Sequence, residues 1–110
     1  MSRDIRESDW KIFRELRLVA LERLCERALN DMARITSDES KTFHERYLAI
    51  FKVLNKRDRE VANAFNDFRR STAVLQLGII ASYDLLTEAE LSRFSEEVQD
   101  RVQFLRTERA

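Results

Sequence analysis

Residues 74–85 read VLQLGIIASYDL, and this stretch decides the fold because its apolar side chains point all round a helix. A helix that is apolar on every side must be buried on every side. One short neighbouring helix could not cover it, so we expect a second copy of the chain to complete the cover. The residues predicted to form this homodimer contact are Val74, Leu75, Leu77, Ile79, Ile80 and Tyr83.

The composition around this stretch is that of an all-α protein. The chain has 110 residues, with no proline and a single glycine, Gly78. The turn residues that join short strands are therefore almost absent, whereas good helix formers are common. With 44% hydrophobic residues, a chain of this length is expected to form one domain that spans residues 1–110.

Two capping-box patterns divide the chain into three predicted helices. Thr36 with Glu39, and Thr87 with Glu90, match the T-x-x-E pattern. In this pattern the two side chains bond to free backbone N–H groups at the start of a helix. We therefore expect helices over about residues 8–35, 37–85 and 88–106.

The expected central helix is unusually long. At about 100° per residue, one apolar stripe continues through Phe43, Tyr47, Ile50, Leu54, Val61, Phe65, Phe68, Leu75, Ile79 and Tyr83. A straight helix of this span would be roughly 70 Å long, twice the diameter of about 35 Å expected for a compact monomer. We expect three antiparallel amphipathic helices, completed as a helical bundle or coiled coil by homodimerisation. The alternative is a three-helix monomer in which both the first helix and the central helix are broken, the central one near residues 71–78.

The first helix changes its apolar face near Ala20. The residues before the change are Ile12, Phe13, Leu16 and Val19, and those after it are Leu21, Cys25, Ala28, Met32 and Ile35. The two halves are therefore predicted to pack against different neighbours, one of which could belong to another chain. Because Cys25 lies in the second apolar set, we expect a buried, inert thiol.

Asp58 is the candidate polar core position, because it falls on the central stripe between Leu54 and Val61. A buried carboxylate there would need a partner. One interpretation is that the core opens at this point, so that Asp58 is solvated or salt-bridged and fixes the helix register. The other is that Asp58 lines a polar pocket.

No catalytic, cofactor-binding or metal site is predicted. A single glycine cannot build a phosphate-binding loop, and His44 has no second ligand at the i, i+4 spacing of helical metal sites. The 20 basic and 20 acidic residues cancel, and acidic residues interrupt or adjoin the basic runs near 56–59 and 69–70. This pattern argues against a nucleic-acid partner.

The expected function is that of a helical protein–protein interaction module, an adaptor or regulator that forms a homodimer and binds an unknown protein partner. One alternative is a small all-helical dimeric enzyme or small-molecule-binding protein that uses arginine and carboxylate side chains. Another is a weak nucleic-acid-binding regulator.

The sequence also indicates where in the cell the protein is expected. The first nine residues lack the apolar core of a signal peptide, and no apolar run reaches the roughly 20 residues of a membrane span. A single cysteine suits a reducing compartment. We therefore expect a cytoplasmic protein with no membrane partner.

Overall fold

The structure, a computed structural model, describes residues 5–109 and contains only helices and connecting segments over that range. The elements are α1 (Glu7–Thr36), α2 (Phe43–Phe65), the 3₁₀ turn η1 (Arg70–Thr72), α3 (Ala73–Ser82), α4 (Glu88–Leu91) and α5 (Glu96–Arg109). The all-α fold class is confirmed, and the helices pack as a bundle. Within residues 5–109, no helix combines the length and apolar character needed to cross a membrane.

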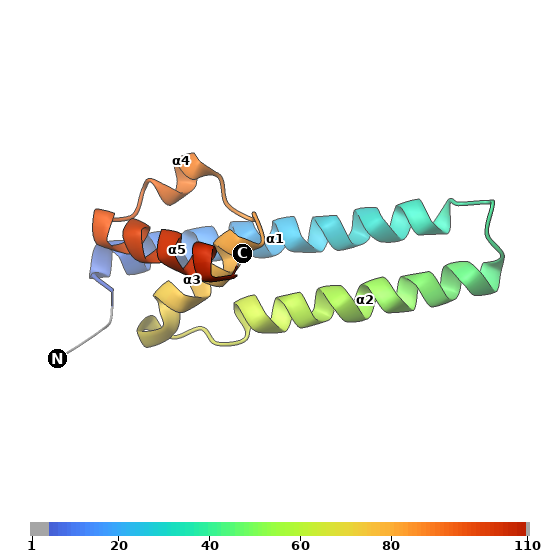
Figure 1. The fold of residues 1–110 in the computed structure, drawn as a ribbon, viewed down its shortest axis with the longest axis horizontal. Helices are drawn as coiled ribbons and strands as arrows, with labels where there is room; N and C mark the ends of the chain where they lie inside the picture. The colour runs from blue at the N-terminus through green and yellow to red at the C-terminus, as the bar shows by residue number, and fades with distance from the viewer. Residues whose placement is uncertain (1–4, 110) are drawn as a thin grey trace.

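A hairpin of α1 and α2 runs the length of the molecule (Figure 1). Arg57 of α2 bonds to Asp31 of α1, while Arg17, nearer the start of α1, donates to the carbonyl of Phe65 at the end of α2. α3, α4 and α5 gather beside the N-terminal half of α1, and the α1–α2 loop projects away from them (Figure 1). The molecule measures 57 × 25 × 24 Å. We call residues 5–24 and 66–109 the head, and residues 25–60 the arm.

The central helix begins later than predicted. α2 starts at Phe43, where Thr42 and Glu45 form the capping box: the Thr42 N–H donates to the Glu45 carboxylate at 2.8 Å, and the Glu45 N–H donates to Thr42 Oγ1 at 3.0 Å. Thr36, the predicted start, is instead the last residue of α1. The predicted capping box of Thr36 and Glu39 is therefore wrong.

The central helix also breaks, so the predicted continuous helix over residues 37–85 is wrong. α2 ends at Phe65, and the backbone is extended at Arg69, with φ −133° and ψ 148°. Asn66 and Asp67 follow the end of α2, and their short polar side chains compete with helical hydrogen bonds. The Asp67 carboxylate binds Arg69 at 2.6 Å. This break turns the apolar residues 74–85 back into the head, whereas a straight helix would carry them into solvent.

The last predicted helix is also divided. The capping box of Thr87 and Glu90 is confirmed, with N–H to oxygen distances of 2.8 and 3.1 Å. However, α4 has only four residues, and α5 follows as a separate helix. Before α5, the Ser95 N–H and hydroxyl donate to the Asp9 carboxylate at 2.9 and 2.8 Å. Asp9 is only 2% exposed, so a buried carboxylate ties the first turn of α1 to the start of α5.

α3 lies at the centre of the head core. Eight of its ten residues are buried, and α1 contributes Phe13, Leu16 and Ala20 to the same core. α5 packs so closely that a Cβ on Gly78 would lie 2.7 Å from Leu105 Cδ1. The sequence predicts that a second copy of the chain completes the cover of residues 74–85, whereas helices of the same chain already bury most of them.

Candidate protein-binding surface

Away from the head, the two helices of the arm lie beside each other, apart from the other helices of residues 5–109 (Figure 1). No residue from 25 to 60 is buried. The apolar side chains in the seam between the helices are only partly covered: Ala28, Met32 and Ile35 on α1, and Ala49, Ile50 and Val53 on α2. A two-helix layer covers only its seam, so both helices keep exposed faces.

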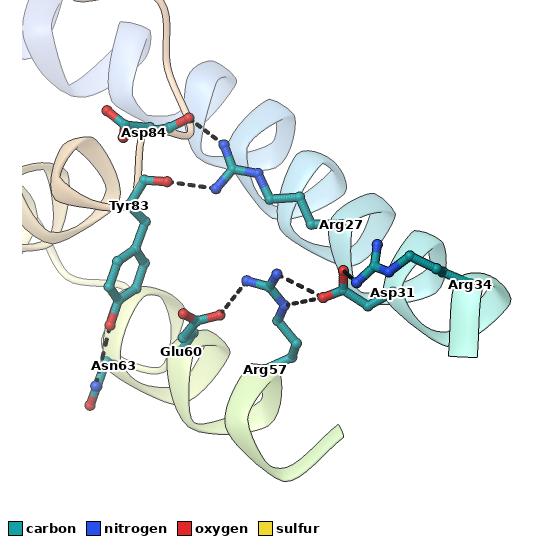
Figure 2. Close-up of polar contacts among 8 residues, drawn as sticks. All are labelled: Arg27, Asp31, Arg34, Arg57, Glu60, Asn63, Tyr83 and Asp84. Atoms are coloured by element: carbon teal, nitrogen blue, oxygen red, sulfur yellow. Dashed lines mark hydrogen bonds and ion pairs between the residues drawn. The ribbon is translucent and has the colours of Figure 1, made fainter. Parts of the chain in front are cut away.

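One edge of the seam is polar (Figure 2). The Arg57 guanidinium donates to carboxylate oxygens of Asp31 and Glu60 at 2.8 and 2.9 Å. Arg34 also donates to Asp31, at 3.0 Å. Hydrogen bonds from Arg57 and then Arg34 lower the pKa of Asp31, and those to Asp31 and Glu60 raise the pKa of Arg57. The charges on this edge therefore satisfy one another.

The polar edge continues into the head. Arg27 donates to the backbone carbonyls of Tyr83 and Asp84, both at 2.6 Å, and the Asn63 amide donates to the Tyr83 hydroxyl at 3.4 Å (Figure 2). These carbonyls follow the C-terminus of α3, the negative end of its dipole. Asp84 has φ 56°, a left-handed conformation that turns the chain away from α3. Arg27 therefore fixes the direction of the arm relative to the head.

Arg23, one turn earlier on α1, makes a similar contact. It donates to Glu90 at 2.6 and 2.9 Å and to the Leu85 carbonyl at 2.9 Å. The hydrogen bonds from Arg23, with help from the Thr87 N–H and against the effect of burial, lower the pKa of Glu90 from 4.5 to about 2. The start of α4 is thereby anchored to α1.

Large apolar side chains lie exposed along the hairpin. We call six of them the apolar face, namely Leu18 (60% exposed), Leu29 (65%), Phe43 (84%), Tyr47 (65%), Phe51 (57%) and Leu54 (49%). The aromatic members, Phe43, Tyr47 and Phe51, are of the kind that dominates protein interfaces when buried.

Helix rotation places these six side chains on one side of the hairpin. At about 100° per residue, Leu18 and Leu29 lie about 140° and 160° round α1 from Asp31. The four members on α2 lie about 100° to 180° round that helix from Glu60, all in one sense of rotation. Leu48, which is 51% exposed, lies about 120° from Glu60 in the other sense and is not part of the apolar face. Because Asp31 and Glu60 both line the polar edge, the apolar face occupies the opposite side of the seam.

Two residues singled out from the sequence lie on the same side. Asp58 is exposed and about 160° round α2 from Glu60, so it is solvated and lies outside the core. Cys25 is exposed and unpaired, so the prediction of a buried thiol is wrong. The apolar stripe predicted for this part of α2 lies on one side of the helix. In the arm, however, no other segment of residues 5–109 covers its exposed members Phe43, Tyr47 and Leu54.

The predicted homodimer contact in α3 lies mostly inside the head. Val74, Leu77, Ile79 and Ile80 are at most 9% exposed, Tyr83 is partly exposed, and Leu75 is 51% exposed. The exposed apolar surface is therefore concentrated on the arm. Sequence reasoning missed this location because an all-round apolar segment has the same pattern whether its own chain or a partner covers it.

The basic residues considered for nucleic-acid binding are largely engaged within the chain. Arg57 belongs to the polar edge, Arg69 pairs with Asp67 at 2.6 Å, and Arg70 pairs with Glu7 at 2.8 Å. Near His44, the Glu45 carboxylate accepts the Thr42 N–H. Among residues 5–109, no group of three or more histidine, cysteine or acidic side chains is arranged to hold a metal ion.

A surface hollow of about 430 Å³ between α3 and α5 is a place where a small molecule could bind. Arg106 lines it and donates to Glu88 at 3.0 Å, with Asp84 at 3.8 Å. Because two carboxylates neutralise Arg106, this hollow offers little attraction to an anionic substrate.

Comparisons with known proteins leave the apolar face as the main guide to function. No family model, curated protein or solved structure matches this chain.

Proposed function

We propose that this chain is a helical protein–protein interaction module, an adaptor or regulator, that binds an apolar helical surface of another protein molecule through the apolar face. The observation that carries the proposal is the gathering of six large, exposed apolar side chains on one side of a two-helix layer. The bound surface can belong to a different protein or to a second copy of this chain. An exposed, unpaired thiol at Cys25 is in keeping with the reducing cytoplasm, where we place the module.

The size of the apolar face supports a binding role. With about 150–250 Å² for a large side chain, the exposed fractions amount to roughly 600–900 Å². Monomeric proteins rarely expose contiguous apolar patches larger than about 300–600 Å². A patch of this size therefore favours an interface over ordinary surface.

The arm also holds the apolar face in a defined shape. Arg46 donates to the Thr36 carbonyl at 2.7 Å and lies over the Phe43 ring, 4.7 Å from its centroid. Arg57 joins the two helices farther along, through Asp31. A surface that is rigid before binding loses less conformational entropy on binding, so these contacts favour recognition by a helical partner.

The arginines give less support to an electrostatic enzyme. Many lie in ion pairs or on backbone carbonyls, among them Arg23, Arg27, Arg57, Arg70, Arg93 and Arg106. An enzyme of that kind would need arginines aimed at an open substrate site. The interaction role therefore accounts for more of the exposed chemistry.

Site-specific photo-crosslinking in cells of the native host tests the proposal. A benzophenone amino acid would replace Tyr47 on the apolar face, and in the control it would replace Lys52, which is exposed and about 140° away round α2. We expect ultraviolet-dependent protein adducts from position 47, lost when Phe51→Glu is added, and few from position 52. No adduct from position 47, or equal adducts from both positions, would overturn the proposal.

A further inference from the structure

We infer that the protein bound to the apolar face is a second copy of this chain, an inference that rests on the proposed function. Two hairpins would pack with their apolar faces together and their residue 37–42 loops at the same end. The product is a four-helix bundle with a head on each outer side.

The area of the apolar face is suited to such a dimer. The roughly 600–900 Å² of exposed surface on its six residues is of the same order as the roughly 800 Å² that each partner contributes to a standard stable interface. The arm is a two-helix layer whose seam is only half-covered. A second identical layer has the same length and would cover the whole apolar face.

Charge allows two copies to approach each other. The chain has 20 basic and 20 acidic residues, so no net repulsion opposes pairing. The exposed acidic residues on this side include Glu22, Glu26 and Asp58, about 180°, 220° and 160° round their helices from the polar-edge residues in the sense of the apolar face. Glu22 and Glu26 lie beyond Leu18 and Leu29, at the outer edge of the apolar face, so their carboxylates can stay in solvent at the rim of the interface, where charged groups are common. Asp58 lies between Tyr47 and Phe51 round α2, so its carboxylate would need a partner or water within the interface.

The two helices of the arm contribute side chains of different size at the same level. The contacts of Arg46 with Thr36 and of Arg57 with Asp31 bracket which residues lie level with each other. Because the two helices rise equally per residue, the first contact places Phe51 and Tyr47 level with residues 31 and 35, and the second places them level with residues 37 and 41. Within this range the α1 residues on the apolar side are Ala33 and Thr36, about 200° and 140° round α1 from Asp31 in the same sense as Leu29. At the levels of Phe51 and Tyr47 α1 therefore carries small side chains on this side, whereas Leu54 lies level with residues 28–34, which include Leu29.

This difference in size determines how two copies would pack. With the loops at the same end, α1 of each copy lies against α2 of the other, so that Phe51 and Tyr47 meet small residues. With the loops at opposite ends, α2 would lie against α2, which sets large side chains on large ones and leaves gaps between the small ones. Close packing favours the first arrangement.

Sedimentation equilibrium of the purified full chain at micromolar concentration tests the second copy. We expect twice the 13.1 kDa mass of the chain. The double variant Phe51→Glu, Leu54→Glu should sediment as a monomer with unchanged helical circular dichroism, because both side chains are exposed in the single chain. The control Lys52→Glu, on the other side of α2, should stay dimeric.

Spin labels in the loop test the arrangement. With Cys25→Ser and a label on Lys41→Cys, we expect a label separation far below the 57 Å length of one chain. A separation similar to or greater than that length would overturn the arrangement with the loops at the same end.

The outcomes separate this inference from the proposed function. A monomeric wild-type chain, together with position-47 adducts to a different protein, would overturn the second copy and leave the interaction role standing. A monomer without such adducts would overturn both. A dimer that survives Phe51→Glu, Leu54→Glu would place the contact elsewhere and overturn the inference.

Discussion

Arg57 and Asp31 are joined by two hydrogen bonds across the seam of the hairpin, at 2.8 Å from Nη2 and 3.3 Å from Nε. Both side chains are about 20% exposed. Arg57 also holds Glu60. This guanidinium therefore links α1 and α2 where the chain has no buried core.

Replacing Arg57 with leucine should lower the free energy of unfolding by about 1–3 kcal/mol, because Asp31 and Glu60 lose their shared donor in a partly covered site. Urea unfolding followed by circular dichroism measures the loss. The control is Arg34→Leu, since Arg34 is 72% exposed and an exposed pair contributes about 0–1 kcal/mol. Equal losses for the two variants would contradict a special role for Arg57.

Glu90 should make the stability depend on pH. Its pKa in the folded chain is about 2, against 4.5 without its partners. A carboxylate with a lowered pKa adds stability that is fully present above the unfolded value and is lost as the pH falls from about 4.5 towards 2. We expect Glu90→Gln to be less stable at neutral pH by about 1–2 kcal/mol, a value reduced for solvent screening.

The measurement is the free energy of unfolding of both proteins at several pH values between 7 and 2. The two should converge as the pH approaches 2, whereas the exposed control Glu97→Gln should follow the wild type closely. A constant difference between Glu90→Gln and the wild type over this range would contradict the assignment.

The buried carboxylate of Asp9 should be more important than its place in a charged N-terminal stretch suggests. Asp9→Ala leaves the Ser95 N–H and hydroxyl without their acceptor, which should cost about 2–4 kcal/mol. Asp9→Asn keeps one acceptor oxygen and should cost less. A double-mutant cycle with Ser95→Ala, read by thermal unfolding, should show coupling of at least about 1 kcal/mol, and simple additivity would argue that the contact contributes little.

Gly78→Ala should destabilise the head although alanine is the better helix former. The new Cβ would lie 2.7 Å from Cδ1 and 2.8 Å from Cβ of Leu105. Overpacking costs about 1–3 kcal/mol, against a gain of about 1 kcal/mol in helix propensity. We expect a net loss of up to about 2 kcal/mol in urea unfolding.

Leu105→Ala provides the check on this interpretation. It removes two of the three close atoms, so Gly78→Ala should be less harmful in that background than in the wild type. A Gly78→Ala chain more stable than the wild type by about 1 kcal/mol, the full gain in helix propensity, would show that α5 can move away at no cost.

The fold class and one helix start were predictable because they depend on local chemistry. The absence of proline and the single glycine predict helices, and the capping box of Thr87 and Glu90 forms as expected. Thr42 and Glu45 match the same pattern as Thr36 and Glu39. In the structure, the Thr36 hydroxyl instead donates to the Met32 carbonyl in the turn before it. The T-x-x-E pattern alone therefore could not show which threonine, Thr36 or Thr42, precedes the start of the helix.

The break after Phe65 and the exposed arm were not predictable for a different reason. No proline or glycine marks residues 66–72, and the apolar stripe keeps its phase through the break. The break depends on packing, because it returns α3 to the head. Similarly, Leu54 in the arm and Phe65 at the end of α2 belong to one stripe, yet Leu54 is 49% exposed and Phe65 is 5% exposed. Their exposure differs only because helices distant in the sequence pack against one of them and not against the other.

The arm contributes no buried residue to the core, and this independence has a consequence for how the protein can vary. Seven residues inserted at the same level of α1 and α2 would preserve the faces of both helices and lengthen the arm by about 10 Å. The head would keep all its packing. Selection or design can therefore change the length of the arm without changing how the head folds.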